Sequence, residues 1–431
     1  MGINSCGQLL IDQGNFFNTG LLNWDTTAKT ANFTAVNGNG YFVNTTSAAI
    51  TVTLPAGSAG DFIGVSDYAS TSETNVITIS PNGTDKINGT NENYTIVTKG
   101  IAVSLLYVDS TRGWKAVASN SKNITGAAFI TATGGTVTTC GDYKTHVFTG
   151  PGTFCVTAGS GDIAVAEYLV VAGGGGGGDG AGPPYQFKQN GGGGAGGFRT
   201  FYSCGTANPL SGPAAIPISV QAYPITVGSG GAGAPTTGVG TDGSNSIFST
   251  ITSTGGGAGQ TDTTVGNDGG SGAGGGGSDG NRLGGSGNTP PVSPSQGNDG
   301  GGGSGSPGAS DNGGGGGGGA GTIGGGGGPV SGCSALGGVG GDGSYVSNDF
   351  FGPPAPSYGE CGPVSSTRYF AGGAGGGNHT LYGPQAVRPG GVGGGGNGGP
   401  STTAGSTNMG GGGGGGKAGG SGIVVIRYKF Q

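Results

Sequence analysis

Runs of consecutive glycines limit what this chain can fold into more than any other feature of its sequence. Of its 431 residues, 114 are glycine, and most of these lie between Ala172 and Ile423. Glycine is unfavourable in α-helices and inside β-strands, and it loses more backbone entropy on folding than any other residue. This composition is typical of a flexible linker, so an ordered glycine region needs a physical reason.

Two apolar segments bracket the glycine region, Tyr168–Ala172 before it and Ile423–Ile426 after it. Short runs of β-branched and aliphatic residues indicate buried strands, and flexible linkers rarely end in one. We expect the two segments to pair in one sheet. The two ends of the glycine region would then meet, and the glycines would form a closed insertion.

The regular form left for glycine is an extended left-handed helix with about three residues per turn and a rise of about 3.1 Å. It has no internal hydrogen bonds, so neighbouring glycine helices can bond to one another, as in polyglycine II. A helix surrounded by others needs glycine on every face. We therefore expect the uninterrupted runs Gly313–Gly319 and Gly410–Gly416 in the interior, and the run 191–197, which contains Ala195, closer to an edge.

Five dissimilar segments follow one another through this part of the chain: Glu167–Gly178, Gly191–Arg199, Tyr223–Gly228, Asn245–Ser249 and Gly422–Tyr428. In this order they resemble the glycine-rich domain of phage tail and virion appendage proteins, over residues 145–431. The resemblance implies a polyglycine-II bundle whose loops face the host cell, as in adhesins at the ends of tail fibres.

The region before the glycines has the pattern of short strands and turns. Ile50–Leu54 alternates apolar and polar residues and ends at Pro55, as a half-buried strand does, and similar segments follow at regular spacing. This pattern predicts a β-sandwich or β-roll, with Trp114 in its core. The segments Ala49–Pro55, Ala59–Phe62 and Tyr107–Trp114 resemble a β module that recurs in phage tail fibres.

The expected organisation is mainly β, with β-sandwich or β-roll modules followed by the glycine bundle. Residues 1–40 form an attachment or first β segment, 41–120 the tail-fibre-like β domain, and 121–172 a β-hairpin unit leading into the glycine domain. Residues 173–422 form the polyglycine-II bundle with its recognition loops, and 423–431 the closing strand.

The hairpin unit is expected around Pro151, with Thr145–Thr149 and Thr153–Thr157 as its strands. Cys140 and Cys155 flank it and are disulfide candidates, as are Cys333 and Cys361 within the glycine region. Cys6 and Cys204 would then remain free or pair with each other. Disulfides require an oxidising location. The N-terminus is not a secretory signal peptide, but a virion protein made in the host cytoplasm and released by lysis needs none.

Aromatic residues gather in three loops of the glycine region and are the candidates for receptor binding. They are Tyr185, Phe187, Tyr345, Phe350, Phe351, Tyr358, Tyr369, Phe370 and Tyr382, with His379 in the third loop. Aromatic rings offer contact area at low entropic cost and stack on sugars. The alternative is that they cap the ends of the bundle. If 371–377 is one pass of the chain, the second and third loops lie at opposite ends.

Catalytic patterns are weak. Matches to Gly-x-Gly-x-x-Gly follow from composition, and none connects a strand to a helix as a dinucleotide site requires. His146 lies in a predicted strand and His379 in a loop without a nearby Cys or Asp, so we expect no enzyme, no cofactor and no metal site. Only 8% of residues are charged and the net charge is −6, which argues against nucleic-acid binding.

The leading hypothesis is a phage virion appendage, a tail fibre or adhesin whose rigid bundle presents loops to a host receptor. The expected partners are other virion proteins, a host-surface glycan or outer-membrane protein, and further copies of the chain in a homotrimer or multimeric fibre. The alternative is a purely structural virion protein: a head fibre, decoration or spacer. Ice binding and a depolymerase activity are weaker alternatives, because the glycine spacing is irregular and no carboxylate pair stands out.

Overall fold

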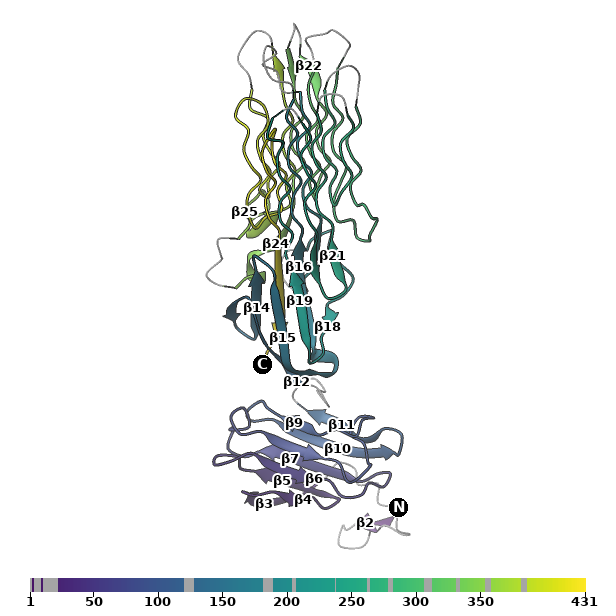
Figure 1. Ribbon diagram of the computed structural model, residues 1–431. Coiled ribbons are helices and arrows are strands. Elements are labelled where there is room, and N and C mark those ends of the chain that lie inside the picture. Colours follow the sequence, from purple (N-terminus) through teal and green to yellow (C-terminus); the bar gives the residue numbers. More distant parts are fainter. Residues whose placement is uncertain are drawn as a thin grey trace. The chain divides into compact units, whose positions relative to one another are not determined.

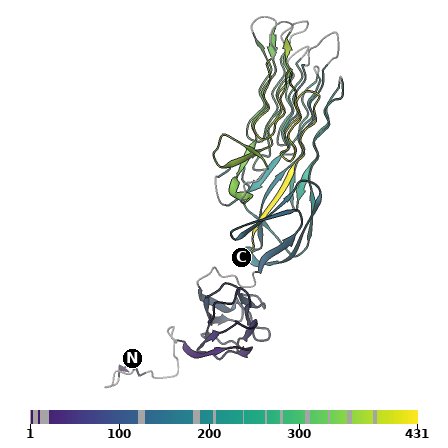
Figure 2. The ribbon, with the colours of Figure 1, turned by 90° about the vertical axis from the view of Figure 1, so that its left-hand side faces the viewer.

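A computed structural model (Figures 1 and 2) describes residues 2–3, 9–10, 22–119, 128–180, 189–203, 207–236, 238–261, 264–277, 282–305, 312–330, 334–352, 358–380 and 386–431. The chain is mainly β. It forms two compact units, one of Met1–Ala128 with Gly159–Ala164, and the other of Phe129–Ala158 with Val165–Gln431.

The first unit consists of two sheets around one apolar core. Its five-stranded sheet has the order β11 (Gly113–Ser119), β10 (Ala102–Asp109), β7 (Phe62–Asp67), β5 (Asn39–Val43) and β3 (Asn23–Lys29). Its four-stranded sheet has the order β4 (Phe33–Thr34), β6 (Ile50–Thr53), β8 (Ile77–Ser80) and β9 (Tyr94–Ile96). A separate pair, β1 (Gly2–Ile3) and β2 (Leu9–Leu10), precedes them.

Successive strands from β3 to β8 alternate between the two sheets, and neighbours within each sheet run parallel. Because side chains alternate along a strand, one set of positions points between the sheets. Val43, Val52 and Ile63 occupy it and are completely buried. Trp114 is also fully buried there, as the sequence predicts.

The second unit has a base of two sheets and a glycine region above it. One sheet has the order β13 (Thr136–Cys140), β14 (Tyr143–Phe148), β28 (Ile423–Lys429), β16 (Val165–Val171) and β17 (Phe198–Phe201), with β18 (Ile216–Pro217) also pairing with β16. The other has the order β12 (Ala128–Thr133), β15 (Gly152–Ser160), β19 (Ala222–Thr226), β20 (Ser246–Phe248) and β21 (Ile251–Ser253). A short 3-10 turn, η1 (Gly161–Ile163), separates β15 from β16.

The closing strand lies where the sequence predicts. β28 pairs antiparallel with β16, and Leu169 stands opposite Val425. Both side chains are completely buried. The two ends of the glycine region therefore meet in one sheet, and the prediction of their pairing is confirmed.

The predicted hairpin around Pro151 is wrong. β14 pairs with β13 and β28, whereas β15 pairs with β19 in the other sheet. Each strand finds an apolar partner elsewhere: Val147 stands opposite Val425, and Phe154 opposite Tyr223.

The pairing of Cys140 with Cys155 fails for the same reason. Cys140 ends β13 and Cys155 lies on β15, so the two are in different sheets, and both are free cysteines. Cys361 is also free, while Cys6, Cys204 and Cys333 lie outside the described residues.

The glycine segments run side by side as wavy lines away from the base in both views (Figures 1 and 2). They are joined by backbone hydrogen bonds with a period of three residues. The N–H groups of Gly173 and Gly176 donate to the segment 241–244, those of Gly174 and Gly177 to 417–420, and that of Gly175 to Gly194. Consecutive residues thus bond to three different neighbours.

The run 191–197 lies in the interior of this region, so the expectation that it lies near an edge is wrong. Its N–H groups donate to the segments 254–260, 315–318 and 410–413. Its carbonyls accept from three others, at Gly175, at 271–274 and at Ala374. The methyl group of Ala195 is accommodated because it joins an apolar cluster of the base that includes Phe198 and Phe370.

The two uninterrupted runs lie in the interior, as predicted. Gly313–Gly319 is buried throughout, and Gly410–Gly416 is buried except for its last residue, which is half-buried. A Cβ on Gly316 would lie 2.0 Å from the carbonyl oxygen of Val339, and a Cβ on Gly317 would lie 2.0 Å from that of Gly193. Neighbouring backbone therefore excludes side chains from Gly313–Gly319 and from Gly411–Gly414.

Candidate functional site

The longest of the three aromatic loops, described at residues 344–352 and 358–370, folds back onto the base of the second unit. It forms a small sheet of β24 (Ser344–Ser347), β26 (Thr367–Phe370) and β25 (Glu360–Cys361), with a 3-10 turn, η2 (Asn348–Phe350), after β24. The hydroxyl of Thr138 donates to the carbonyl of Phe351 at 3.0 Å, and that of Thr145 donates to the carbonyl of Phe350 at 3.2 Å. These bonds hold the loop against β13 and β14.

Three predicted recognition residues of this loop are core residues. Phe350 and Phe370 are completely buried and Phe351 is 2% exposed. They pack with Leu169, Val425 and other residues of one apolar cluster. Tyr369 is only 7% exposed. Rings this buried have no face left for a receptor, so the capping alternative describes them.

Tyr345 and Tyr358 remain half-buried at the surface. The ring of Tyr345 lies 5.3 Å from that of Tyr369 across the β24–β26 pair, and its hydroxyl donates to the carbonyl of Ala207 at 2.8 Å. Asn208 donates to the carbonyl of Tyr345 as well. Residues 207 and 208 thus help to hold the tyrosine pair. Sequence reasoning missed this contact because it spans well over a hundred residues.

The opposite end of the glycine region, called the tip here, carries its own small sheet. It consists of β22 (Gly328–Val330), β23 (Ser334–Leu336) and β27 (His379–Thr380). Figure 1 places β22 far from β24 and β25, which lie beside the base. The aromatic loop and His379 are thus at opposite ends, as predicted, and do not form one site. Tyr185, Phe187 and Tyr382, and the side chain of His379, lie outside the described residues.

Asparagine side chains border the glycine runs at the tip. Asn190, Asn312 and Asn378 each adjoin a run and are at most 5% exposed. The amide of Asn190 donates to the carbonyl of Gly178, while the oxygen of Asn378 accepts from Gly337 N–H at 2.9 Å. These amides replace backbone partners where the regular pattern ends. The sequence signal, an Asn next to a glycine run, was overlooked.

Charged side chains at the tip occur where neighbouring segments form isolated bridges. Asp179 bridges to Gly238, Arg282 to Gly303, and Arg388 to Gly398. Both arginines are half-buried, and their Nε atoms have no hydrogen-bond partner among the described residues. Buried donors without partners are uncommon in proteins. The Nε atoms themselves are buried, so what the two arginines offer at the tip is positive charge rather than free donors.

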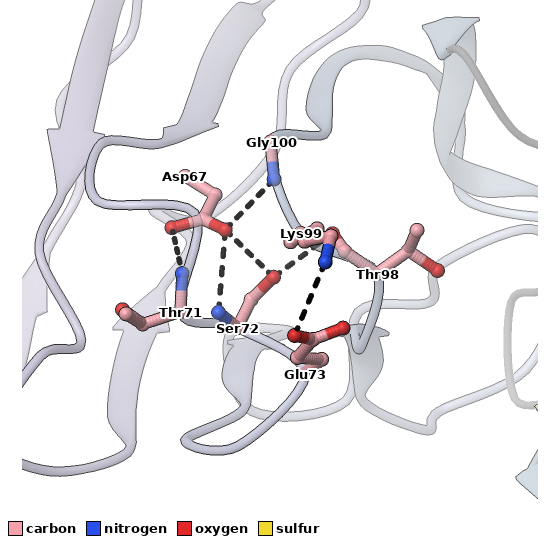
Figure 3. A network of polar contacts seen from close by, with 7 residues as sticks. All are labelled: Asp67, Thr71, Ser72, Glu73, Thr98, Lys99 and Gly100. Atoms are coloured by element: carbon pink, nitrogen blue, oxygen red, sulfur yellow. Dashed lines mark hydrogen bonds and ion pairs between the residues drawn. The ribbon is translucent and has the colours of Figure 1, made fainter.

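Two further polar clusters serve structure. In the first unit, the carboxylate of Asp67 accepts bonds from Gly100 N–H at 3.0 Å and from the hydroxyl of Ser72 at 2.8 Å (Figure 3). Burial raises the pKa of Asp67, but the bonds from Gly100, Ser72 and Thr71 outweigh it and hold that pKa below its usual value. The cluster ties two loops together and is enclosed by its own partners.

In the second unit, His146 is completely buried. Its Nδ1 lies 2.7 Å from the carbonyl of Gly134, and its Nε2 lies 3.1 Å from the hydroxyl of Tyr428. Burial lowers the pKa of His146 and raises that of Tyr428 to about 12. Both groups are thus neutral near pH 7, and they join β14 to the closing strand.

The described residues contain no group of three or more His, Cys, Asp and Glu side chains able to hold a metal ion. In the part of the chain that the structure describes, no helix is long and apolar enough to cross a membrane.

Comparison with known proteins agrees with the glycine pattern. The model of a family described as a glycine-rich domain matches residues 148–429, which is more than half of the chain. Among curated proteins, no significant match is found. The matched region contains the closing strand, the glycine segments and most of the base, and the chain therefore belongs to this glycine-rich domain family.

Proposed function

We propose that this protein is a phage virion appendage, a tail fibre or adhesin, whose rigid glycine block presents its tip to a receptor on the host surface. The observation that carries the proposal is the closure of the block. β16 and β28 hold both ends of the glycine region in one sheet, so the tip is displaced from the base by ordered backbone. A flexible linker could not position a binding surface in this way.

We infer that the glycine segments pack as polyglycine-II helices. The three-residue period of their hydrogen bonds fits the about three residues per turn of such helices. Segments with three donor and three acceptor neighbours, such as 191–197, fit a packing in which each helix is surrounded by others. The backbone collisions expected for a Cβ at Gly313–Gly319 also fit, because no face of an interior helix is free.

The recognition surface is proposed at the tip rather than at the aromatic loop of the base. The half-buried Arg282 and Arg388 supply positive charge there. The tip sheet also joins the neighbouring strands β22 and β23 to β27, which comes from a distant part of the sequence. A host glycan or outer-membrane protein would be the receptor, and further virion proteins and copies of the chain would be the other partners. The protein would be made in the host cytoplasm and would act on the virion, without an enzymatic activity.

The purely structural alternative has its own support. The burial of Phe350, Phe351 and Phe370 makes the longest loop part of the base, as expected if loops seal the ends of a spacer. Under this alternative the tip arginines would contact another virion protein rather than a host.

Binding to intact cells separates the two functions. Fluorescently labelled full-length protein is incubated with a panel of bacterial strains, and bound protein is measured by flow cytometry. Saturable binding to some strains, weakened about tenfold by Arg282→Ala with Arg388→Ala, would support the adhesin; tenfold corresponds to about 1.4 kcal/mol. Arg112→Ala, an exposed arginine of the first unit, is the matched control. If no strain is bound, or if the double variant Arg282→Ala with Arg388→Ala binds like wild type, the tip is not a receptor-binding surface.

A further inference from the structure

The outer face of the five-stranded sheet in the first unit is unusually apolar. The positions that alternate with the core residues carry Trp24, Phe42, Phe62, Gly64, Ser66, Ala102, Ser104, Leu106 and Lys115, with Tyr68 following β7. Tyr68 is 59% exposed and Trp24 is 38% exposed. The other outer face of the same unit carries Thr51, Thr53, Thr78 and Ser80, which is the polar pattern expected of a solvated sheet.

Aromatic side chains line one side of this apolar face, with neighbouring rings tilted or edge-on to one another. A Cβ on Gly40 would lie 2.6 Å from Cδ2 of Trp24, so the indole ring rests directly on that glycine and extends to Gly64. The ring of Phe42 lies 5.0 Å from that of Trp24, and the ring of Tyr68 lies 6.4 Å from that of Phe42. At the centre of the face, Leu22 and the edge of the Trp24 ring lie over Gly64, where a Cβ would be 2.4 Å from Cδ1 of Leu22. Phe62 lies beside Leu106 on the far side. The face is therefore apolar from its aromatic edge to its far side.

Size and charge indicate what could cover the face. Five strands about 4.8 Å apart, each with about six residues of 3.3 Å, give roughly 500 Å². Two such faces in contact bury on the order of 1,000 Å², about the lower limit for a specific interface. Among the outward-facing residues named above, only Lys115 is charged. A face with so little charge can meet its own copy with little repulsion, and a contact between identical patches closes as a two-fold pair.

We propose that the outer face of the sheet β11-β10-β7-β5-β3 binds the same face of a second copy of this chain. In this contact the exposed rings of Trp24 and Tyr68 are covered by the apolar face of the other copy, which removes their apolar area from water. The proposal draws on the proposed function only for the expectation that several copies assemble. Receptor binding at the tip of the second unit does not depend on it.

The test measures the mass of the full-length protein by sedimentation over about 1 to 100 μM, the range suited to a small interface. We expect a dimer at the upper end and more than a tenfold weaker association for Tyr68→Lys and for Leu106→Lys. Thr34→Lys, an exposed position on the polar outer face of the same unit, should leave the association unchanged. Melting temperatures close to wild type would show that each variant is folded.

A photo-crosslinking residue at position 68 identifies the contact. Cross-links between two chains that join the faces carrying Phe42 and Leu106 support the proposal. A protein that stays monomeric at 100 μM overturns it, and so does a dimer that is insensitive to both lysine variants. Cross-links to another surface of a second chain, or to residues 11–21 of the same chain, would assign the face to a different occupant and also overturn it. None of these results changes what the cell-binding experiment is expected to show, so failure of this proposal can be told apart from failure of the proposed function.

Discussion

Glu167 and Arg427 stand directly opposite each other in the β16–β28 pair and form an ion pair with both side chains only 8% exposed. The guanidinium carbon of Arg427 lies 3.6 Å from the centre of the Tyr143 ring, and Ser203 N–H donates to the Glu167 carboxylate at 3.2 Å. The pair therefore links the strand that enters the glycine region to the strand that leaves it.

Loss of one partner of this pair should destabilise the second unit strongly. Arg427→Ala leaves a buried carboxylate without its cation, which costs about 3–5 kcal/mol. The double variant Glu167→Leu with Arg427→Leu removes both charges and should be closer to wild type. Chemical denaturation of the three proteins checks this. If the double variant is as unstable as Arg427→Ala, the cost does not come from an unpaired charge.

Removal of the closing strand tests whether the pairing holds the glycine block together. Deletion of Ile423–Gln431 removes the partner of both β14 and β16 and exposes Leu169 and Val171, which are completely buried. We expect rapid proteolysis between residues 173 and 422, with the first unit left intact. If the truncated protein keeps native protease resistance, the glycine segments hold together without the sheet.

Acid should weaken the second unit through His146. Because burial lowers the pKa of His146 in the folded protein, the unfolded chain binds a proton more readily, near pH 6.5. The stabilising effect of the neutral ring is complete above that pH and is lost as the pH falls below it. His146→Gln does not titrate and can still donate to Gly134. Between pH 7.5 and 5, the melting temperature should therefore fall more steeply for wild type than for His146→Gln. If the two proteins lose the same number of degrees over this range, His146 is not the group responsible.

The parts of the fold that follow from local patterns could be predicted from sequence. The apolar run Ile423–Ile426 has to be buried, and the run most similar to it in length and apolar composition is Tyr168–Ala172. The partner of β14 could not be predicted, because a short turn at Pro151 favours a hairpin, while the choice of sheet depends on the distant strands β28 and β19.

The candidate site was harder to predict for a related reason. Aromatic residues in a long loop have the same sequence pattern whether they face solvent or fold back, and only tertiary contacts bury Phe350 and Phe370. The sequence does not reveal the central place of the run 191–197, because Ala195 interrupts the glycines as an edge residue would. Its methyl group instead meets the apolar cluster at the base. The asparagines at the tip could have been predicted from a local pattern, because each stands next to a glycine run.

Substitution of interior glycines tests the packing of the block. A Cβ on Gly316 would lie 2.0 Å from the carbonyl oxygen of Val339, and one on Gly413 would lie 2.2 Å from that of Lys417. Both contacts are with backbone, so neighbouring segments must separate and their hydrogen bonds lengthen or break.

Each buried group left without a partner costs about 1–3 kcal/mol, so Gly316→Val and Gly413→Val should each lower the melting temperature by several degrees or more. Thr322→Val is the comparison, because Thr322 is exposed and already carries a Cβ, so the change removes only the hydroxyl that accepts from Asp342 N–H at 2.7 Å. It should lower the melting temperature less than either glycine substitution. A flexible glycine region would not distinguish the three substitutions, so equal melting temperatures would contradict the packed arrangement.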